Sequence, residues 1–215
     1  MPTIFLSPST QEYNPYVTGA GSEEYFMNLL ADAMEPLLLA NGIQFVRNDP
    51  QGTVGNSIRQ SNADSYDFHL ALHSNASGSG SEGQNRGIIA FYYPGSAGGQ
   101  RGAELIAKNL REIYPLPDKV TTRPTTALGE VSRSRFPAVL VEIGYHDNYS
   151  DALWLESHVE DVARQLVKAL TEYFGLPFIP PMDPKRGTVR LSYGTLNLRS
   201  TPSPAGTVIA NLPND

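Results

Sequence analysis

One acidic residue follows a strongly apolar stretch in the second half of the chain. Residues 137–141, Pro-Ala-Val-Leu-Val, run directly into Glu142, and polar side chains follow from Tyr145 to Asn148. A stretch this apolar is typical of a strand that is buried on both faces of a parallel sheet. A carboxylate directly after such a strand needs a hydrogen-bonding partner or a metal. Since open α/β sheets bind ligands at the carboxyl ends of their strands, Glu142 is predicted to be a catalytic carboxylate.

Two histidines and a second acid are placed to reach the same edge of the sheet. His73 ends a predicted strand, and His146 follows the strand that leads to Glu142. Glu24 lies in the first turn of a helix predicted at residues 23–40, although an acid there could also be a surface charge that complements the helix dipole. Two imidazoles and a carboxylate suit a Zn²⁺ site with an open coordination position. Glu142 would then be the general base for the zinc-activated water.

The other two histidines are predicted to be structural. His69 lies further back on the strand that ends at His73, which places it outside a shared ligand sphere. His158 begins a late helix, where an exposed position explains it equally well.

Strands and helices alternate through most of the chain, which predicts an α/β fold with a mostly parallel central sheet and helices on both faces. Ser22 is expected to be the N-cap of the first long helix. Residues 115–135 are expected to form a short strand pair or a loop over the site. Strands are predicted at residues 3–6, 43–46, 66–73, 87–93 and about 137–142, and helices at residues 23–40, 54–63, 99–114, 149–156 and 158–174.

The pattern changes after residue 175, so residues 1–175 are predicted to form the catalytic domain. Residues 176–186 are rich in proline and are expected to form a stiff linker. Alternating side chains in residues 187–215 predict a short all-β C-terminal tail.

Composition excludes several classes of function. The net charge of −6 and the pI near 5.2 argue against nucleic acid as a partner. The chain has no cysteine, which excludes thiolate catalysis and cysteine-based zinc sites. We expect neither a transmembrane segment nor a signal peptide, because no stretch is apolar and long enough and the N-terminus lacks a basic region. The oligomeric state is not determined by the sequence.

Four segments together resemble a known family of cell-wall enzymes. Residues 72–76 read Leu-His-Ser-Asn-Ala, and residues 141–148 read Val-Glu-Ile-Gly-Tyr-His-Asp-Asn. Glu24 begins the long helix, and residues 58–63 read Ile-Arg-Gln-Ser-Asn-Ala. In this order and spacing, the segments resemble the zinc-dependent N-acetylmuramoyl-L-alanine amidases of the amidase-3 type, over roughly residues 4–174.

The resemblance implies hydrolysis of peptidoglycan, at the amide bond between N-acetylmuramic acid and the L-alanine of the stem peptide. It implies that Glu24 and His73 bind zinc and that Glu142 is the general base. Asn75 and Asn148 are candidates for binding the substrate. Such an enzyme acts at the bacterial cell wall or outside the cell, as an autolysin or endolysin. Without a signal peptide, release by lysis, a prophage holin or another route is expected. The tail is similar to the first half of a bacterial Src-homology-3-like module.

The first loop departs from the family pattern. The family usually has Asp-Pro-Gly-His-Gly there, whereas residues 7–11 read Ser-Pro-Ser-Thr-Gln, so the expected histidine falls on Thr10. The third zinc ligand could then be the amide oxygen of Gln11 or the imidazole of His146. The separate variants Gln11→Ala and His146→Ala distinguish the two by their zinc content.

Two rival functions remain open. The missing histidine motivates a catalytically impaired cell-wall binding protein of the same fold. Another zinc hydrolase, such as a carboxypeptidase, is less consistent with residues 72–76, because carboxypeptidase zinc motifs differ from Leu-His-Ser-Asn-Ala.

Overall fold

The computed structural model describes residues 1–180, 196–199 and 208–212. Its centre is a six-stranded sheet with the strand order β2-β1-β3-β6-β4-β5. Most neighbouring strands run parallel, and the α/β class predicted from the sequence is confirmed. The strands of this sheet are β1 (Thr3–Pro8), β2 (Gln44–Arg47), β3 (Phe68–Asn75), β4 (Ile88–Tyr92), β5 (Val120–Pro124) and β6 (Ala138–Tyr145).

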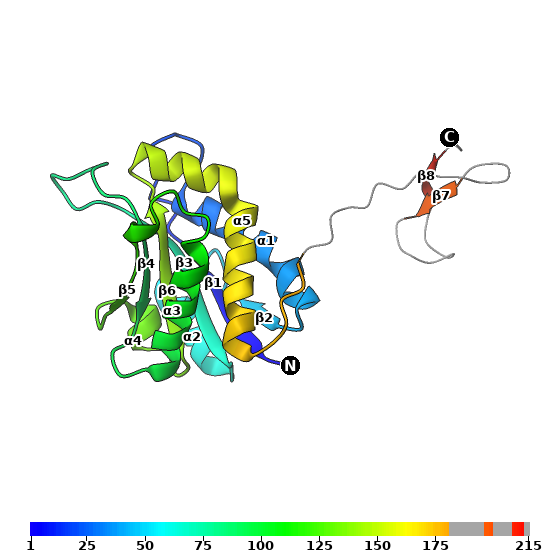
Figure 1. Ribbon diagram of the computed structural model, residues 1–215, viewed down its shortest axis with the longest axis horizontal. Helices are drawn as coiled ribbons and strands as arrows, with labels where there is room; N and C mark the ends of the chain where they lie inside the picture. Colours follow the sequence, from blue (N-terminus) through cyan, green and yellow to red (C-terminus); the bar gives the residue numbers. More distant parts are fainter. Residues whose placement is uncertain (181–195, 200–207, 213–215) are drawn as a thin grey trace. The chain divides into compact units, whose positions relative to one another are not determined.

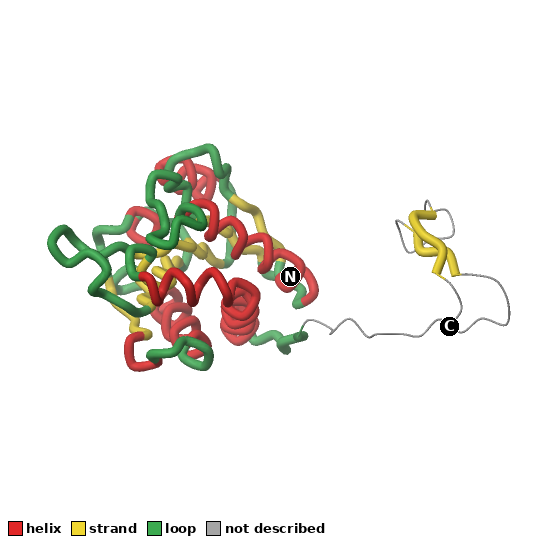
Figure 2. Tube along the Cα trace, turned by 90° about the horizontal axis from the view of Figure 1, so that it is seen from above, coloured by secondary structure: helices red, strands yellow, loops and turns green. Residues whose placement is uncertain are grey.

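Helices cover both faces of the sheet. Helices α1, α3 and α5 pack together on one face, and α2 packs with α4 on the other (Figures 1 and 2). The helices are α1 (Glu23–Ala40), α2 (Val54–Ala63), α3 (Ala97–Leu110), α4 (Gly129–Ser132) and α5 (Tyr149–Phe174), with a 3₁₀ turn η1 at Pro117–Lys119. The sheet is therefore the middle layer of three.

Alternation along the strands divides the interior into two parts. Leu70 and Leu72 of β3 face the large core under α1, α3 and α5. The intervening Ala71 faces the smaller cluster under α4. His69 and His73 share the face of Ala71, because successive side chains of a strand point to opposite faces. In the register of β3 and β6, His73 pairs with Glu142. Both side chains therefore lie on the face that α2 and α4 cover, which is called the thinly covered face below.

Several elements match their predicted bounds. Helices α1 and α2 begin and end where the sequence predicted, and the Ser22 hydroxyl caps α1 by accepting a hydrogen bond from the Tyr25 amide, as expected. The two late helices are one helix, α5, with a kink at His158. Strand β4 runs antiparallel to β6, which the sequence pattern did not indicate.

The first compact unit extends to Pro180. Leu176 and Phe178 pack against the large core, and Asn41 exchanges two hydrogen bonds with the backbone of Ile179. The predicted linker at residues 176–186 therefore begins as part of this unit, and its later residues lie outside the described ones.

A second unit covers residues 181–215. Its described part is an antiparallel pair, β7 (Leu196–Arg199) and β8 (Val208–Leu212). The rest of the predicted Src-homology-3-like segment, residues 187–215, lies outside the described residues. Among the helices that the structure describes, none is long and apolar enough to cross a membrane.

Candidate active site

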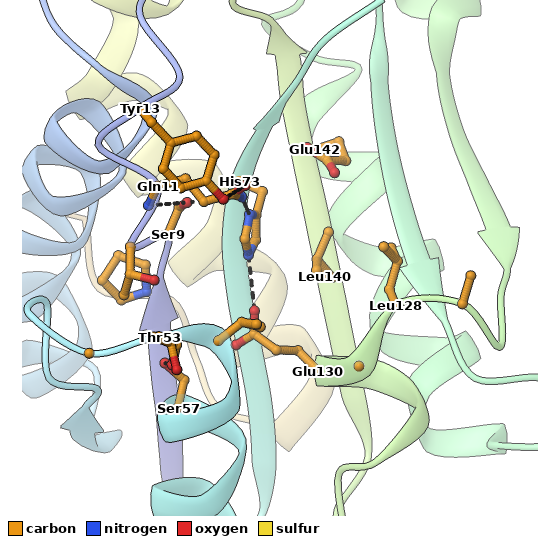
Figure 3. A pocket seen from close by; sticks show the side chains of 16 residues that line it. Ser9, Gln11, Tyr13, Thr53, Ser57, His73, Leu128, Glu130, Leu140 and Glu142 are labelled. Atoms are coloured by element: carbon orange, nitrogen blue, oxygen red, sulfur yellow. Dashed lines mark hydrogen bonds and ion pairs between the residues drawn. The ribbon is translucent and has the colours of Figure 1, made fainter. Parts of the chain in front are cut away.

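A pocket of about 380 Å³ opens beside the carboxyl ends of β1, β3 and β6, on the thinly covered face (Figure 3). It lies between the loop after β1, the N-terminus of α2 and the short helix α4. Its lining consists of Pro8 to Gln11, Tyr13, Gly52 to Val54, Ser57, His73, Ala127 to Glu130, Leu140 and Glu142.

His73 is the centre of the polar side of this pocket. Its Nδ1 lies 2.8 Å from Oε1 of Glu23, and its Nε2 lies 3.0 Å from Oε2 of Glu130. Burial alone would lower the pKa of His73, but its hydrogen bonds to Glu130 and Glu23 outweigh burial and raise the pKa to about 10. In this arrangement His73 is an imidazolium held between two carboxylates.

Glu130 is one of those carboxylates and is almost completely buried. Besides His73, it accepts a hydrogen bond from the Ser7 hydroxyl at 2.5 Å and lies 3.3 Å from Nε2 of His69. Burial opposes ionisation, yet hydrogen bonds from His69 and His73 hold the pKa of Glu130 well below its usual range. The carboxylate is therefore ionised in the interior because donors surround it.

Gln11 closes the other side of the site. Its amide nitrogen lies 3.3 Å from both Oε1 of Glu23 and Nδ1 of His73. Its amide oxygen accepts hydrogen bonds from the Tyr13 hydroxyl and the Asn14 side chain. Gln11 thus presents its NH₂ group, and not its oxygen, to Glu23 and His73.

Glu142 lines the same pocket from the neighbouring strand β6 (Figure 3). Its Oε2 is buried and has no hydrogen-bond partner. Burial raises the pKa of Glu142 to about 7; the charge of His73 opposes this, whereas the charges of Glu23 and Glu130 add to it. A carboxylate with such a pKa and a free oxygen can take a proton from water near neutral pH.

The structure brings some of the predicted site residues together and separates others. His73, Gln11 and Glu142 meet in the pocket. Glu24 does not approach His73, because its side chain accepts a hydrogen bond from Asn28 one turn along α1. The neighbouring Glu23 points inward instead and is 1% exposed.

His146 lies apart from the pocket lining. Its Nδ1 donates to the carbonyl oxygen of Ser74 at 3.0 Å, and its ring stacks against Tyr16. Its backbone pairs with Asn75 and Val17. The structure therefore does not bring this imidazole to His73.

The two predicted substrate-binding asparagines have bonds within the protein. Asn148 caps α5 through its oxygen and donates from its amide to the carbonyl of Gly83 at 2.5 Å. Asn75 accepts a hydrogen bond from the amide of Ala76. Neither residue is part of the pocket lining, and Asn148 secures the loop before β4.

Sequence analysis missed Glu23 and Glu130. Glu23 could have been found as the other acid of the pair at the start of α1, since one residue of rotation decides which of the two faces the sheet. Glu130 lies in the segment at residues 115–135, which has no clear periodicity. The only available signal was an isolated acid between Leu128 and Val131, an apolar setting for a charge.

Glu23 and His73 are the pair that could hold a metal. Among the residues that the structure describes, no group of three His, Asp or Glu side chains converges on one point. The pair supplies two of the three protein ligands of a catalytic Zn²⁺ site: an oxygen and an imidazole nitrogen converge, and the other nitrogen of His73 faces a carboxylate, as metal-bound histidines usually do. Gln11 could add a third ligand only if its amide turned and broke the bonds from Tyr13 and Asn14.

The fold is shared with solved amidase structures. The amidase AmiC2 of Nostoc punctiforme is 15% identical, with a TM-score of 0.70 over 81% of this chain and 97% of that one. The catalytic domain of the amidase CwlV from Bacillus (Paenibacillus) polymyxa var. colistinus is 19% identical, with a TM-score of 0.70 over 82% of this chain and 100% of that one. The catalytic domain of an endolysin targeting Clostridia difficile is 20% identical, with a TM-score of 0.65 over 80% of this chain and 98% of that one.

A comparison with curated proteins found no match. The sequence profile of the amidase-3 family, described as N-acetylmuramoyl-L-alanine amidase, matches residues 5–172, which include all of the six-stranded sheet except the first two residues of β1. The chain therefore belongs to the amidase-3 family of peptidoglycan amidases.

Proposed function

We propose that the protein hydrolyses the amide bond between N-acetylmuramic acid and L-alanine in bacterial peptidoglycan, with Glu23 and His73 as zinc ligands and Glu142 as general base. The observation that carries the proposal is the buried Oε2 of Glu142, which has no hydrogen-bond partner and lies in a pocket that His73 also lines, with Glu23 buried 2.8 Å from Nδ1 of His73. Family membership supports the substrate class.

The metal-binding pair and Glu142 have separate tasks in this reaction. Zinc, when bound by Glu23 and His73, supplies a Lewis acid that polarises the scissile carbonyl and acidifies water. Glu142 takes the proton of the attacking water and later gives it to the departing nitrogen of L-alanine, so one carboxyl group serves as base and then as acid. Its pKa of about 7 suits both steps near neutral pH.

The rim of the pocket suits an extended glycan-peptide. Tyr13 is 77% exposed and Val54 is 51% exposed, and both line the opening. An exposed aromatic ring can pack against the apolar face of a sugar while its hydroxyl keeps a polar partner, here the oxygen of Gln11.

The direct test is the release of stem peptides from purified peptidoglycan. We expect the zinc-loaded protein to produce peptides with a free L-alanine amino group, detected by mass spectrometry. Glu142→Gln should abolish this release while zinc binding remains, since the side chain keeps its shape and loses its basicity. Near-normal turnover by that variant would remove Glu142 from the mechanism.

A second function has one observation in its favour. Only two residues of the usual zinc-binding types converge among the described side chains, and the first loop has Thr10 where the family has histidine. A protein that binds the cell wall without hydrolysing it would need no complete zinc site. Sedimentation with peptidoglycan and no released peptide, at saturating zinc, would favour this alternative.

The third ligand can be assigned with two variants. Gln11 borders the pair Glu23 and His73, whereas His146 lies outside the pocket lining. We therefore expect His146→Ala to keep its zinc and Gln11→Ala to bind it more weakly. Loss of zinc from His146→Ala alone would instead place the imidazole in the ligand set.

A further inference from the structure

Glu130 is a buried carboxylate for which the proposed hydrolysis has no direct use. It sits on the short helix α4 with 3% of its surface exposed, below His73 in Figure 3. One oxygen accepts from Nε2 of His73, and the other accepts from Ser7 and faces His69. Burying a carboxylate is costly unless donors surround it, so these contacts are what allows Glu130 to remain there.

The donors are themselves fixed by the fold. Nδ1 of His69 lies 2.8 Å from the Ser61 hydroxyl of α2, and the His69 ring stacks on Phe5 of β1 with 5.4 Å between ring centroids. Ser7 lies within the paired part of β1, where it is the register partner of Ala71 in β3. Glu130 is therefore held by Ser7 and His69, which lie on the same face of the sheet as His73 but further back along β1 and β3.

We propose that Glu130 is a positioning residue for the zinc ligand His73. Because Glu130 accepts the Nε2 hydrogen, the ring is fixed with Nδ1 turned toward Glu23, 2.8 Å away. A carboxylate behind a metal-binding histidine sets both its tautomer and its orientation. This inference rests on the proposed function, since it concerns the same metal site.

Three variants of the full chain separate positioning from a general structural role. Glu130→Ala removes the acceptor, and Glu130→Gln retains an oxygen that can accept from His73. Glu172→Gln is the matched control, because Glu172 is a partly buried acid on α5 that bonds Lys108 and Asn109 on the other side of the sheet. Two readouts apply to each: the zinc dissociation constant from competition with a chelator, and the ring ¹⁵N shifts of His73, which report the nitrogen that carries the proton.

Loss of positioning should appear in both readouts. We expect Glu130→Ala to weaken zinc binding by about 10- to 100-fold, as loss of such a partner typically does. In the zinc-loaded form, where His73 is neutral, its ring should no longer show a single tautomer with the proton on Nε2. Glu130→Gln and Glu172→Gln should stay close to wild type in both. If Glu130→Ala does not fold, Glu130→Asp replaces it, because the shorter carboxylate keeps the charge but loses the reach to His73.

Other outcomes would contradict the positioning role of Glu130 alone, or the amidase function as well. A folded Glu130→Ala or Glu130→Asp variant with wild-type zinc affinity and unchanged His73 shifts would overturn the positioning role and leave the amidase proposal intact. A wild-type chain that binds no zinc and releases no peptide would overturn both. Equal loss of zinc in Glu130→Ala and Glu130→Gln, with unchanged His73 shifts, would also contradict positioning through the His73 hydrogen bond.

Discussion

Opposing effects of the surroundings determine the pKa of the Glu142 carboxyl group. Burial disfavours its charge, the positive charge of His73 favours it, and the nearby carboxylates Glu23 and Glu130 disfavour it again. The net result is a pKa of about 7, well above that of an ordinary glutamate. Because Oε2 has no partner, the proton is exchangeable with whatever enters the pocket.

This pKa predicts the pH dependence of hydrolysis. Only the ionised form of Glu142 is a base, so kcat/KM should fall about tenfold per pH unit below the pKa of Glu142 and become level above it. That pKa is about 7 without metal, and the charge of bound zinc lowers it. A pH-rate profile on a soluble muropeptide measures this directly. Bound zinc must be determined at each pH, because metal binding also weakens in acid. A rate that stays constant down to the lowest pH at which zinc remains bound would contradict the assignment.

The same environment predicts that the catalytic group destabilises the fold at high pH. The pKa is raised in the folded state, so folding favours the protonated form, and the contribution of Glu142 to stability is lost as the pH rises through about 7. Glu142→Gln has no charge to bury and should raise the free energy of unfolding of the metal-free protein at pH 8 by about 1–3 kcal/mol. Urea unfolding at pH 8 and pH 5 tests this, and the gain should shrink at pH 5. A variant less stable than wild type at pH 8 would show that Glu142 is not strained there.

At this scale, sequence patterns located part of the site. His73 and Glu142 were found because each lies near the carboxyl end of a strand, a position that the apolar pattern before it reveals. The choice between Glu23 and Glu24 could not be made, since both lie in the first turn and only the packing of α1 decides which one faces the sheet. Glu130 was missed because its partners, including His73, come from distant segments and meet only in the folded chain.

At the scale of the elements, helix α3 packs so closely on the sheet that one of its positions has room only for glycine. A Cβ added at Gly102 would lie 2.6 Å from the ring of Phe68 and 3.3 Å from Val139. Phe68 is fully buried, so its ring has no free space to move into. The missing side chain is what lets the helix approach β3 and β6 at this point.

Gly102→Ala should therefore destabilise the protein by about 1–3 kcal/mol, because overpacking outweighs the better helix propensity of alanine. The matched control is Gly55→Ala in α2, where the nearest atoms, on Arg59 and Thr53, lie 3.6 and 3.7 Å from the added Cβ. That change should be neutral or stabilising by up to about 1 kcal/mol. Thermal unfolding of both variants measures the difference, and equal midpoints would refute the close-packing argument.

Elements with strong end signals were predicted well. Ser22 caps α1, and the bounds of this helix followed from apolar periodicity and its cap. Helix α2 also has its predicted bounds, and the structure adds Thr53 as its cap. Residues 115–135 could not be resolved, because β5 and α4 are too short to show a period. The antiparallel direction of β4 depends on the path of the loop at residues 76–87, which no local pattern encodes.

At the scale of the whole molecule, the end of the first unit lies beyond the last residue of α5. The helix ends at Phe174, and Gly175 continues the chain in a left-handed conformation. Leu176 and Phe178 then return to the large core. Residues 176–186 were predicted to form a linker because they are rich in proline. The first residues of this segment instead pack against the core.

This boundary predicts a difference between two truncations. A chain of residues 1–180 keeps the contacts of Leu176 and Phe178 and both hydrogen bonds between Asn41 and Ile179, and a chain of residues 1–175 loses them. The shorter chain should be less stable by about 2–4 kcal/mol, from lost apolar burial and the loss of both hydrogen bonds between Asn41 and Ile179. Urea unfolding of the two chains measures the difference. Asn41→Ala in the 1–180 chain removes both bonds with Ile179 together with the bond from the Asn41 amide to the carbonyl of Leu37, and should cost about 1–2 kcal/mol. Equal stability of the two truncations would mean that the unit ends at Gly175, as the composition alone suggested.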